Sequence, residues 1–176
     1  MNDSRTIVGV MTGTSLDGID AAVIQVRGTG LNLQPTLLDH ASGPLGPVAD
    51  VLRTWSEGTP LTAGEIAQAA TDLGRACVST ITGMEAAADC DLAGVHGQTV
   101  FHRPPYSLQL LDPAPLAAAL NCPTMYDFRS ADLTAGGEGA PITPLSDWLM
   151  YRHRRPTAVI NLGGFCNLTA LPPRDA

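Results

Sequence analysis

The sequence contains no lysine, and all ten of its basic residues are arginines. Without lysine there is no phosphate-binding loop of the Gly-Lys-Ser/Thr type and no Schiff-base chemistry. Any bound phosphate must therefore be held by backbone amides, hydroxyl groups, arginine or a metal ion. Seventeen acidic residues outnumber the arginines and give a net charge of −7. Nucleic acid is therefore not expected as a partner, because binding its phosphates relies on positive charge.

Long apolar segments are also missing. No run approaches the roughly 18–20 apolar residues of a membrane-spanning helix, and the apolar residues 7–11 are too few for a signal-peptide core. We therefore expect a cytoplasmic protein with no membrane partner. The four cysteines lack the Cys-x-x-Cys spacing of a zinc or redox site. We interpret them as small hydrophobic residues in a reducing compartment.

The remaining composition is typical of one globular α/β domain. The 176 residues are 44% apolar and 15% charged, which is enough to form a buried core. Short links between the first three apolar runs predict an antiparallel meander. Strands are expected over residues 6–11, 19–26, 31–38, 91–95, 107–111, 124–126, 157–162 and 167–171. Helices are expected over residues 48–55, 61–88, 113–120 and 144–153.

Two local patterns refine this outline. Thr62 and Glu65 have the spacing of a capping box, and Gly74 and Gly83 are weak points in the helix that follows. The opening order of strand, glycine turn and strand recurs around the glycines at 163–164. This echo suggests two related lobes, the second of which has barely begun.

A polar glycine turn follows the first strand. Glycine lets backbone amides approach phosphate oxygens, and hydroxyl groups can donate further hydrogen bonds. The carboxylate of Asp17 suits magnesium, bound through water. The alternative is an ordinary hairpin turn, in which the same residue types occur for backbone reasons. The candidate phosphate-binding residues are Gly13, Thr14, Ser15, Leu16, Asp17, Gly18, Ile19 and Asp20.

Two further polar segments follow expected strands, where α/β proteins build sites. The first, residues 96–104, offers His96, Gly97, Gln98 and Thr99 to sugar hydroxyls. Its two histidines lack a third nearby ligand, which disfavours zinc, and they could instead be structural.

In the second segment, Asp127 and Asp132 can accept from hydroxyl groups while Arg129 binds an anionic group. The alternative is that Arg129 pairs with these carboxylates. The glycine-rich residues 135–141 follow. This segment is expected to act as a hinge or to bring its backbone close to a ligand. The sequence contains no nucleophile elbow, so it gives no support to a covalent hydrolase.

Five blocks together resemble one family, the anhydro-N-acetylmuramic acid kinases. They are GVMTGTSLDGID at 9–20, VHGQTVFHRP at 95–104, DFRSAD at 127–132, GGEGAP at 136–141 and NLGGFCNLT at 161–169. The family belongs to the superfamily of sugar kinases, heat-shock chaperone ATPases and actin. The resemblance implies a ribonuclease-H-like lobe, with a mixed sheet that opens with an antiparallel hairpin meander and has helices on both faces. Residues 1–156 would form this N-terminal lobe, and residues 157–176 the first hairpin of an incomplete second lobe.

The resemblance also implies a reaction. ATP and water would act on 1,6-anhydro-N-acetylmuramic acid, opening the anhydro ring and giving N-acetylmuramic acid 6-phosphate for cell-wall sugar recycling in the cytoplasm. Residues 13–20 would face ATP and Mg²⁺, with Asp17 on the metal. The amino sugar would be bound by His96, Gly97, Gln98, Thr99, Asp127 and Arg129. A homodimer is compatible with the resemblance.

The sequence departs from the family pattern in three ways. Thr12 stands where serine is usual, and Glu138 where glutamine is usual. Family members are also about twice as long, so the block carrying the likely catalytic aspartate is expected beyond Ala176. The alternative function is therefore a truncated, non-catalytic lobe that is inactive alone. An actin- or chaperone-like ATPase would leave the blocks at 96–104 and 127–141 unexplained.

Overall fold

A computed structural model describes residues 4–154, 156–162 and 166–173. The strands are β1 (Ser4–Thr12), β2 (Ile19–Arg27), β3 (Gln34–Gly43), β4 (Leu92–Val95), β5 (Gln98–Arg103), β6 (Tyr106–Leu110), β7 (Thr124–Tyr126), β8 (Thr157–Leu162) and β9 (Cys166–Leu171). The helices are α1 (Val48–Ser56), α2 (Ala63–Ile81), α3 (Ala114–Leu120), α4 (Ser130–Thr134) and α5 (Pro144–Tyr151). Within these residues no helix is both long and apolar enough to cross a bilayer.

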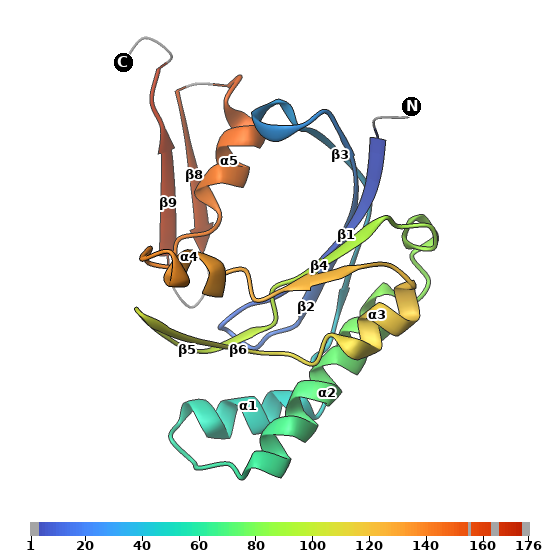
Figure 1. Cartoon of the computed structure of the whole chain (residues 1–176), viewed down its shortest axis with the longest axis vertical. Helices are drawn as coiled ribbons and strands as arrows, with labels where there is room; N and C mark the ends of the chain where they lie inside the picture. The colour runs from blue at the N-terminus through green and yellow to red at the C-terminus, as the bar shows by residue number, and fades with distance from the viewer. Residues whose placement is uncertain (1–3, 155, 163–165, 174–176) are drawn as a thin grey trace.

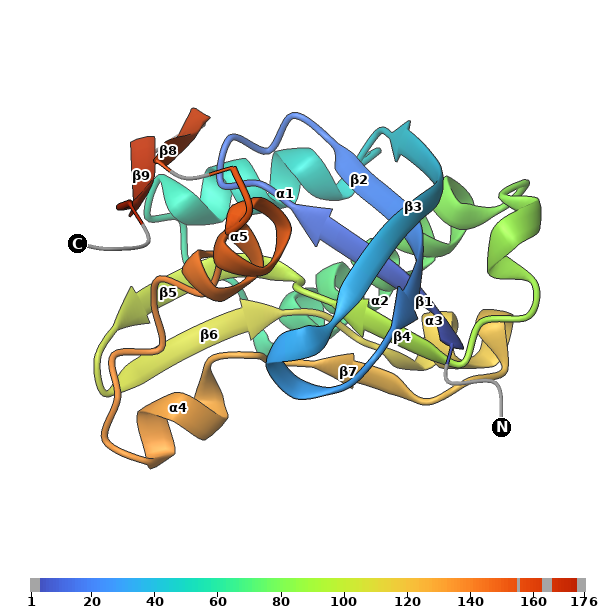
Figure 2. The ribbon, with the colours of Figure 1, turned by 90° about the horizontal axis from the view of Figure 1, so that it is seen from above.

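The main sheet has five strands in the order β3-β2-β1-β4-β7 (Figures 1 and 2). The first three strands form an antiparallel meander, and β4 then joins the free edge of β1 in parallel, followed by β7. Strand β2 therefore runs against the other four. This arrangement confirms the expected α/β class and mixed sheet, and it is consistent with one lobe of the sugar kinase and actin type.

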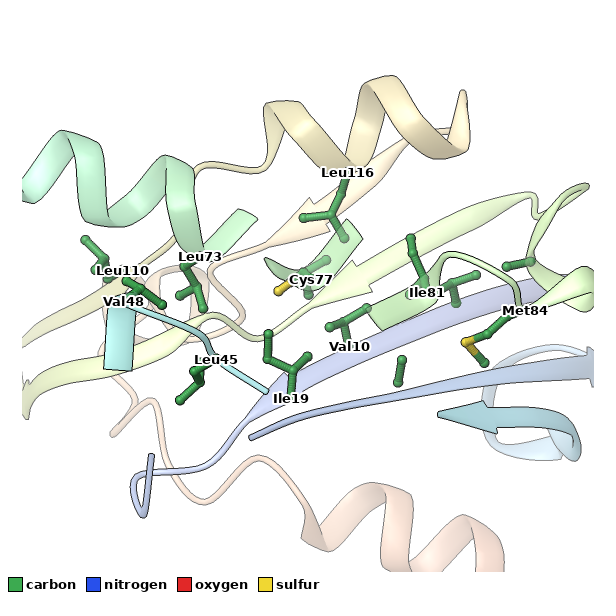
Figure 3. Close-up of a cluster of buried hydrophobic side chains, with 14 of the residues drawn as sticks. Val10, Ile19, Leu45, Val48, Leu73, Cys77, Ile81, Met84, Leu110 and Leu116 are labelled. Carbon is green, nitrogen blue, oxygen red and sulfur yellow. The ribbon is translucent and has the colours of Figure 1, made fainter. Parts of the chain in front are cut away.

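The core lies between this sheet and helices α1, α2 and α3, which cover one of its faces (Figure 1). Alternate residues of β1 and β2, among them Val8, Val10 and Ile19, point toward the helices and are buried. Leu73 and Leu116 meet them from α2 and α3 (Figure 3). Helix α5 contacts β3 from the other side of the sheet, so helices lie on both faces as expected.

Helix α2 shows both the success and the limit of local sequence signals. The capping box is present, since the Thr62 hydroxyl accepts from the Glu65 amide and the Glu65 carboxylate accepts from the Thr62 amide. The helix was expected to reach residue 88 but ends at Ile81. Gly83 explains the stop, because its φ of +95° lies outside the helical region. A short 3₁₀ turn over Glu85–Ala87 follows.

Other expectations need correction. The third strand begins at Gln34 rather than residue 31, because a 3₁₀ turn occupies Gly30–Asn32. Its other end lies at Gly43 rather than residue 38. Residues 98–103 were expected as a loop but form β5, which pairs with β6 in a separate hairpin. Helix α4 was not expected at all.

Strands β8 and β9 form a third sheet, whose strand β9 contacts α5. Ile160, Leu162 and Leu168 of this hairpin are exposed. The glycine turn expected at 163–164 lies outside the described residues. The division into lobes at residue 157 stays a prediction.

Candidate functional site

Three candidate segments begin at one edge of the main sheet. Strands β1, β4 and β7 are parallel neighbours, so their carboxyl ends meet at this edge. The polar turn after Thr12, the segment after Val95 and the segment after Tyr126 begin there. This is where ligands bind in open α/β sheets, and the sheet topology therefore brings both predicted halves of the site together.

The turn predicted to bind phosphate, called the phosphate turn below, spans residues 13–18 and is closed by the Thr12–Ile19 pair of the β1–β2 hairpin. The Leu16 amide donates to the Gly13 carbonyl at 3.2 Å, and Leu16 has a positive φ of 55°. The side chains of Thr14, Ser15 and Asp17 are exposed. Their hydroxyl and carboxylate groups are therefore open to a ligand.

Four other predicted residues, Gly13, Leu16, Gly18 and Ile19, have no polar side chain to offer a ligand. Ile19 is fully buried and Leu16 packs against the core. A Cβ at Gly13 would lie 3.1 Å from the Ser15 hydroxyl, so glycine here leaves room for that side chain. Similarly, a Cβ at Gly18 would lie 3.0 Å from the Gly43 carbonyl. The turn thus brings its backbone close to neighbouring polar groups.

An open cleft of about 530 Å³ borders the turn on the side of β3. It is lined by Asp17, Gly18, Ile19, Asp20, Ser42, Gly43 and Pro44. The Ser42 hydroxyl donates to the Asp20 carboxylate at 2.6 Å and holds it in place. Ser42 is a residue that sequence reasoning missed, because its link to Asp20 depends on the β2–β3 register.

A metal ion would rely on few protein ligands. Within the described residues no group of three or more His, Cys, Asp or Glu side chains could hold a metal. The exposed Asp17 carboxylate suits magnesium, which usually takes one or two carboxylates and keeps several waters beside substrate phosphates. The residues present therefore fit a magnesium ion that keeps most of its water ligands.

On the sugar side, His96 has both ring nitrogens engaged. Its Nε2 lies 3.0 Å from Nη2 of Arg129, and its Nδ1 lies 2.9 Å from the Gly97 carbonyl oxygen. Because a guanidinium group can only donate, Nε2 accepts and the proton sits on Nδ1. Burial lowers the pKa of His96, with a smaller contribution from the Arg129 charge, while the Gly97 contact opposes the shift. His96 is therefore held neutral.

Within the described residues, the charge of Arg129 has no carboxylate partner. The ion pairs found in the described part of the chain join Arg53 to Asp50 and Arg75 to Asp72, so the alternative pairing with Asp127 and Asp132 does not form there. Arg129 instead donates from Nη1 to the Gly139 carbonyl at 2.8 Å. The Nε atom of Arg129 is buried and has no partner among the described residues. Burial also lowers the pKa of the Arg129 guanidinium group. Such a guanidinium group suits an anionic ligand.

The two aspartates near Arg129 instead organise the backbone. Asp127, with a positive φ of 53°, accepts from the Ser130 hydroxyl at 2.6 Å and from its amide at 3.3 Å. These bonds fix the start of α4. Asp132 accepts from the Gly139 amide at 2.7 Å. Both carboxylates keep lone pairs for further donors.

The β5–β6 hairpin adds a row of polar side chains. The Thr99 hydroxyl donates to Gln109 at 2.6 Å, Gln109 donates to Ser107 at 3.0 Å, and Ser107 contacts His102 at 3.1 Å. Gln98 behaves differently, because it is buried beside Leu110 of the core and its Oε1 has no partner in the part of the chain described. Gln109 and Ser107 were missed, although the polar alternation of residues 107 and 109 was a signal.

A second cleft, of about 430 Å³, lies beside the glycine-rich loop. It is lined by Phe128, Asp132, Gly139, Ala140, Pro141 and Ile142. A Cβ at Gly139 would lie 3.3 Å from Cε1 of His102, which places the loop against the polar row. The loop expected to approach a ligand thus borders a cleft. Arg129 contacts this loop through the Gly139 carbonyl.

Known proteins that are similar to this chain come from the same family that its five sequence blocks resemble. The family model described as anhydro-N-acetylmuramic acid kinase matches residues 5–176. Proteins named anhydro-N-acetylmuramic acid kinase from Salinibacter ruber and Gloeothece citriformis are 36% and 38% identical to the chain, over 186 and 187 residues. Each alignment covers 96% of the chain and 47% of the relative, so the chain spans about half the length of these curated relatives. The chain therefore belongs to the anhydro-N-acetylmuramic acid kinase family.

Proposed function

We propose that this chain binds the phosphates of ATP and the anhydro sugar in a kinase that converts 1,6-anhydro-N-acetylmuramic acid to N-acetylmuramic acid 6-phosphate. One observation carries the proposal. The Thr12 hydroxyl at the start of the phosphate turn donates to the Gly97 carbonyl of the sugar-side segment at 2.8 Å. The two sets of candidate residues are thus joined directly at the edge of the sheet, as transfer from ATP to a sugar requires.

On the nucleotide side, the phosphate turn supplies amides and exposed hydroxyl groups to the ATP phosphates. Magnesium would neutralise charge on the transferred phosphoryl group. Asp17 would hold the water shell of that ion. The residues assigned to this side are Gly13, Thr14, Ser15, Leu16, Asp17, Gly18, Ile19 and Asp20.

On the sugar side, Arg129 is the residue with the clearest chemistry. N-acetylmuramic acid carries a carboxylate on its lactyl group, and Arg129 offers a partly buried charge without an ion-pair partner among the described residues. Thr99 and Asp127 offer a hydroxyl and a carboxylate to the sugar hydroxyl groups. Contacts of His96, Gly97 and Gln98 with the sugar stay predictions, because these residues already have partners or are buried.

The overall reaction consumes water. A base activates water to attack the anomeric carbon, the bond to the 6-oxygen breaks, and that oxygen attacks the γ-phosphate to release ADP. None of the residues assigned above is proposed as this base. Because the chain spans about half the length of its curated relatives, we also propose that residues 1–176 alone are inactive and that the complete kinase works in the cytoplasm. The homodimer stays a prediction.

The test uses the native protein and two sugars. An intact-mass measurement first establishes its length, and a coupled assay then follows ADP release with the anhydro sugar and with an analogue that lacks the lactyl carboxylate. We expect turnover with the first and a much weaker response to the second. Arg129→Met should remove this discrimination, while Arg75→Met, which breaks an exposed ion pair on α2, should keep it. Absence of ADP release from the native protein would refute the proposal.

A further inference from the structure

The glycine turn of residues 136–139 is held at both the amide and the carbonyl of one residue, Gly139. We propose that His96 and Asp132 are positioning residues that fix this turn, Asp132 by a direct bond to Gly139 and His96 by orienting Arg129. The consequence for sugar binding rests on the proposed function. The positions of His96, Asp132 and the turn do not depend on the proposed function, so they can be tested without measuring catalytic turnover.

Gly139 is the anchored residue of the turn. Its amide donates to the Asp132 carboxylate at 2.7 Å, and its carbonyl accepts from Nη1 of Arg129 at 2.8 Å. Both bonds have a charged partner, and such bonds are stronger than those between neutral groups. The Gly137 amide adds a bond to the Asp132 carbonyl at 2.8 Å. A turn rich in glycine, otherwise free to adopt many conformations, thus has defined contacts.

His96 fixes the orientation of the guanidinium group that makes one of these bonds. Nη2 of Arg129 donates to His96 while Nη1 donates to Gly139. Two acceptors on two different nitrogens determine the plane of the rigid guanidinium fork. His96 is itself oriented by its Nδ1 contact with the Gly97 carbonyl. The chain of bonds therefore runs from the end of β4 through Arg129 to the glycine turn.

Close packing restricts Gly137 and Gly139, whose amides take part in these bonds. A Cβ at Gly139 would lie 2.9 Å from Cγ of Leu133, and a Cβ at Gly137 would lie 2.3 Å from the Asp132 carboxylate. Asp132 and Gly139 also line the cleft of about 430 Å³. A fixed turn therefore means a preformed wall of that cleft, which lowers the entropy cost of binding a ligand there.

The inference gives His96 a role different from that of a sugar ligand. Both ring nitrogens are engaged in the structure, so contact with a sugar hydroxyl would require the loss of one existing bond. A positioning role instead needs only an acceptor that faces Arg129. Glutamine can supply that acceptor near the place of Nε2, whereas leucine, of similar size, cannot.

The experiment measures amide hydrogen exchange of Gly137 and Gly139 in the native protein. His96→Leu and Asp132→Ala should raise exchange at the turn by roughly tenfold or more, because a local hydrogen bond is lost. His96→Gln should stay close to the wild type. His40→Leu, an exposed change on β3, should leave the turn unaffected. Unchanged exchange in His96→Leu, or equal exchange in His96→Leu and His96→Gln, would overturn the inference.

Two further readouts keep the result interpretable. If His96→Leu fails to fold, the ¹⁵N shifts of His96 in the wild type decide: we expect the Nδ1–H tautomer, and the Nε2–H tautomer would overturn the inference. In the kinase assay, His96→Leu should raise KM for the sugar more than KM for ATP. If exchange responds as expected but the native protein does not turn over the sugar, the proposed function fails and the positioning role stands.

Discussion

The hydroxyl of Thr12 donates to the carbonyl oxygen of Gly97 across the ends of two neighbouring parallel strands, β1 and β4, at a distance of 2.8 Å. The two residues are 85 positions apart in the chain. Thr12 is buried. This side-chain bond adds to the backbone bond from the His96 amide to the Val10 carbonyl, so both link the phosphate turn to the sugar-side segment.

Thr12→Val should destabilise the fold modestly. The change removes the hydroxyl but keeps the shape, and the Gly97 carbonyl still has its contact with His96. We expect a loss of about 1 kcal/mol in the free energy of unfolding, measured by urea denaturation. Thr12→Ser keeps the hydroxyl and should lose less. Equal stability of the valine variant and the wild type would show that the bond contributes nothing.

Gly74→Ala should destabilise α2, although alanine favours helices by about 1 kcal/mol over glycine. A Cβ at Gly74 would lie 2.4 Å from the carbonyl oxygen of Asp112, which is backbone and cannot move aside easily. Overpacking of this kind costs about 1–3 kcal/mol. Thermal unfolding should therefore show a lower Tm.

The matched control is Gly64→Ala in the first turn of the same helix. The nearest atom to a Cβ there is the Thr62 hydroxyl oxygen at 4.0 Å, so the change should be neutral or stabilising. If both variants gained stability, helix propensity would outweigh the close approach at Gly74.

Asp17→Asn should abolish most phosphoryl transfer in the native protein while the fold survives. The carboxylate is exposed at the phosphate turn and is proposed to hold the water shell of magnesium. Lost stabilisation of the transition state typically costs on the order of a hundredfold in rate. Asp89→Asn, an exposed change far along the chain from the turn, serves as the control. Near-normal kcat in Asp17→Asn would contradict the assignment.

Thr99→Val should raise KM for the sugar more than KM for ATP. The hydroxyl lies in the polar row of β5–β6 and donates to Gln109, so its loss removes one partner and disturbs another. An unmade hydrogen bond in a buried site costs roughly 1–3 kcal/mol. Steady-state kinetics with each substrate varied in turn provide the measurement. An effect on ATP alone would mean that the two sides of the site are reversed.

The stability of the protein should fall as the pH drops below about 6.5. Burial lowers the pKa of His96 in the folded state below its usual value of 6.5, so the unfolded chain takes up a proton first. The loss should level off once the folded imidazole is also protonated. His96→Gln lacks this group, so its Tm should change less between about pH 7.5 and pH 5.5. Equal pH dependence in the two proteins would contradict the prediction.

Local features of the sequence predicted much of the fold. The capping box of α2, the meander and the turn after Thr12 follow from short-range spacing and were confirmed. Strand β5 was missed because its polar residues resembled a loop and its partner, β6, could not be identified from residues 98–103 alone. Helix α4 was missed because its start depends on the bonds from Ser130 to Asp127.

The candidate site was predicted less completely than the fold. The residue types of both halves were apparent, but the partners of Arg129 were not, since the flanking aspartates suggested an ion pair that the described chain does not form. Gly74 was interpreted as a weak point in a helix, whereas it permits close approach of the segment that carries Asp112. Of the four cysteines interpreted as small hydrophobic residues, Cys77 and Cys90 are buried and Cys166 is exposed. Each of these facts depends on contacts between distant segments.

The strand order has a consequence for how the chain is made. Strand β1 pairs with β2 within the first 27 residues, but its other edge is covered only by residues 92–95. Because a ribosome adds roughly 5–20 residues per second, the meander can form several seconds before β4 emerges. During that interval the backbone groups along the free edge of β1 are open to pairing with another chain. Strand β1, which is central in the finished sheet, is therefore an edge strand open to aggregation while the chain is being made.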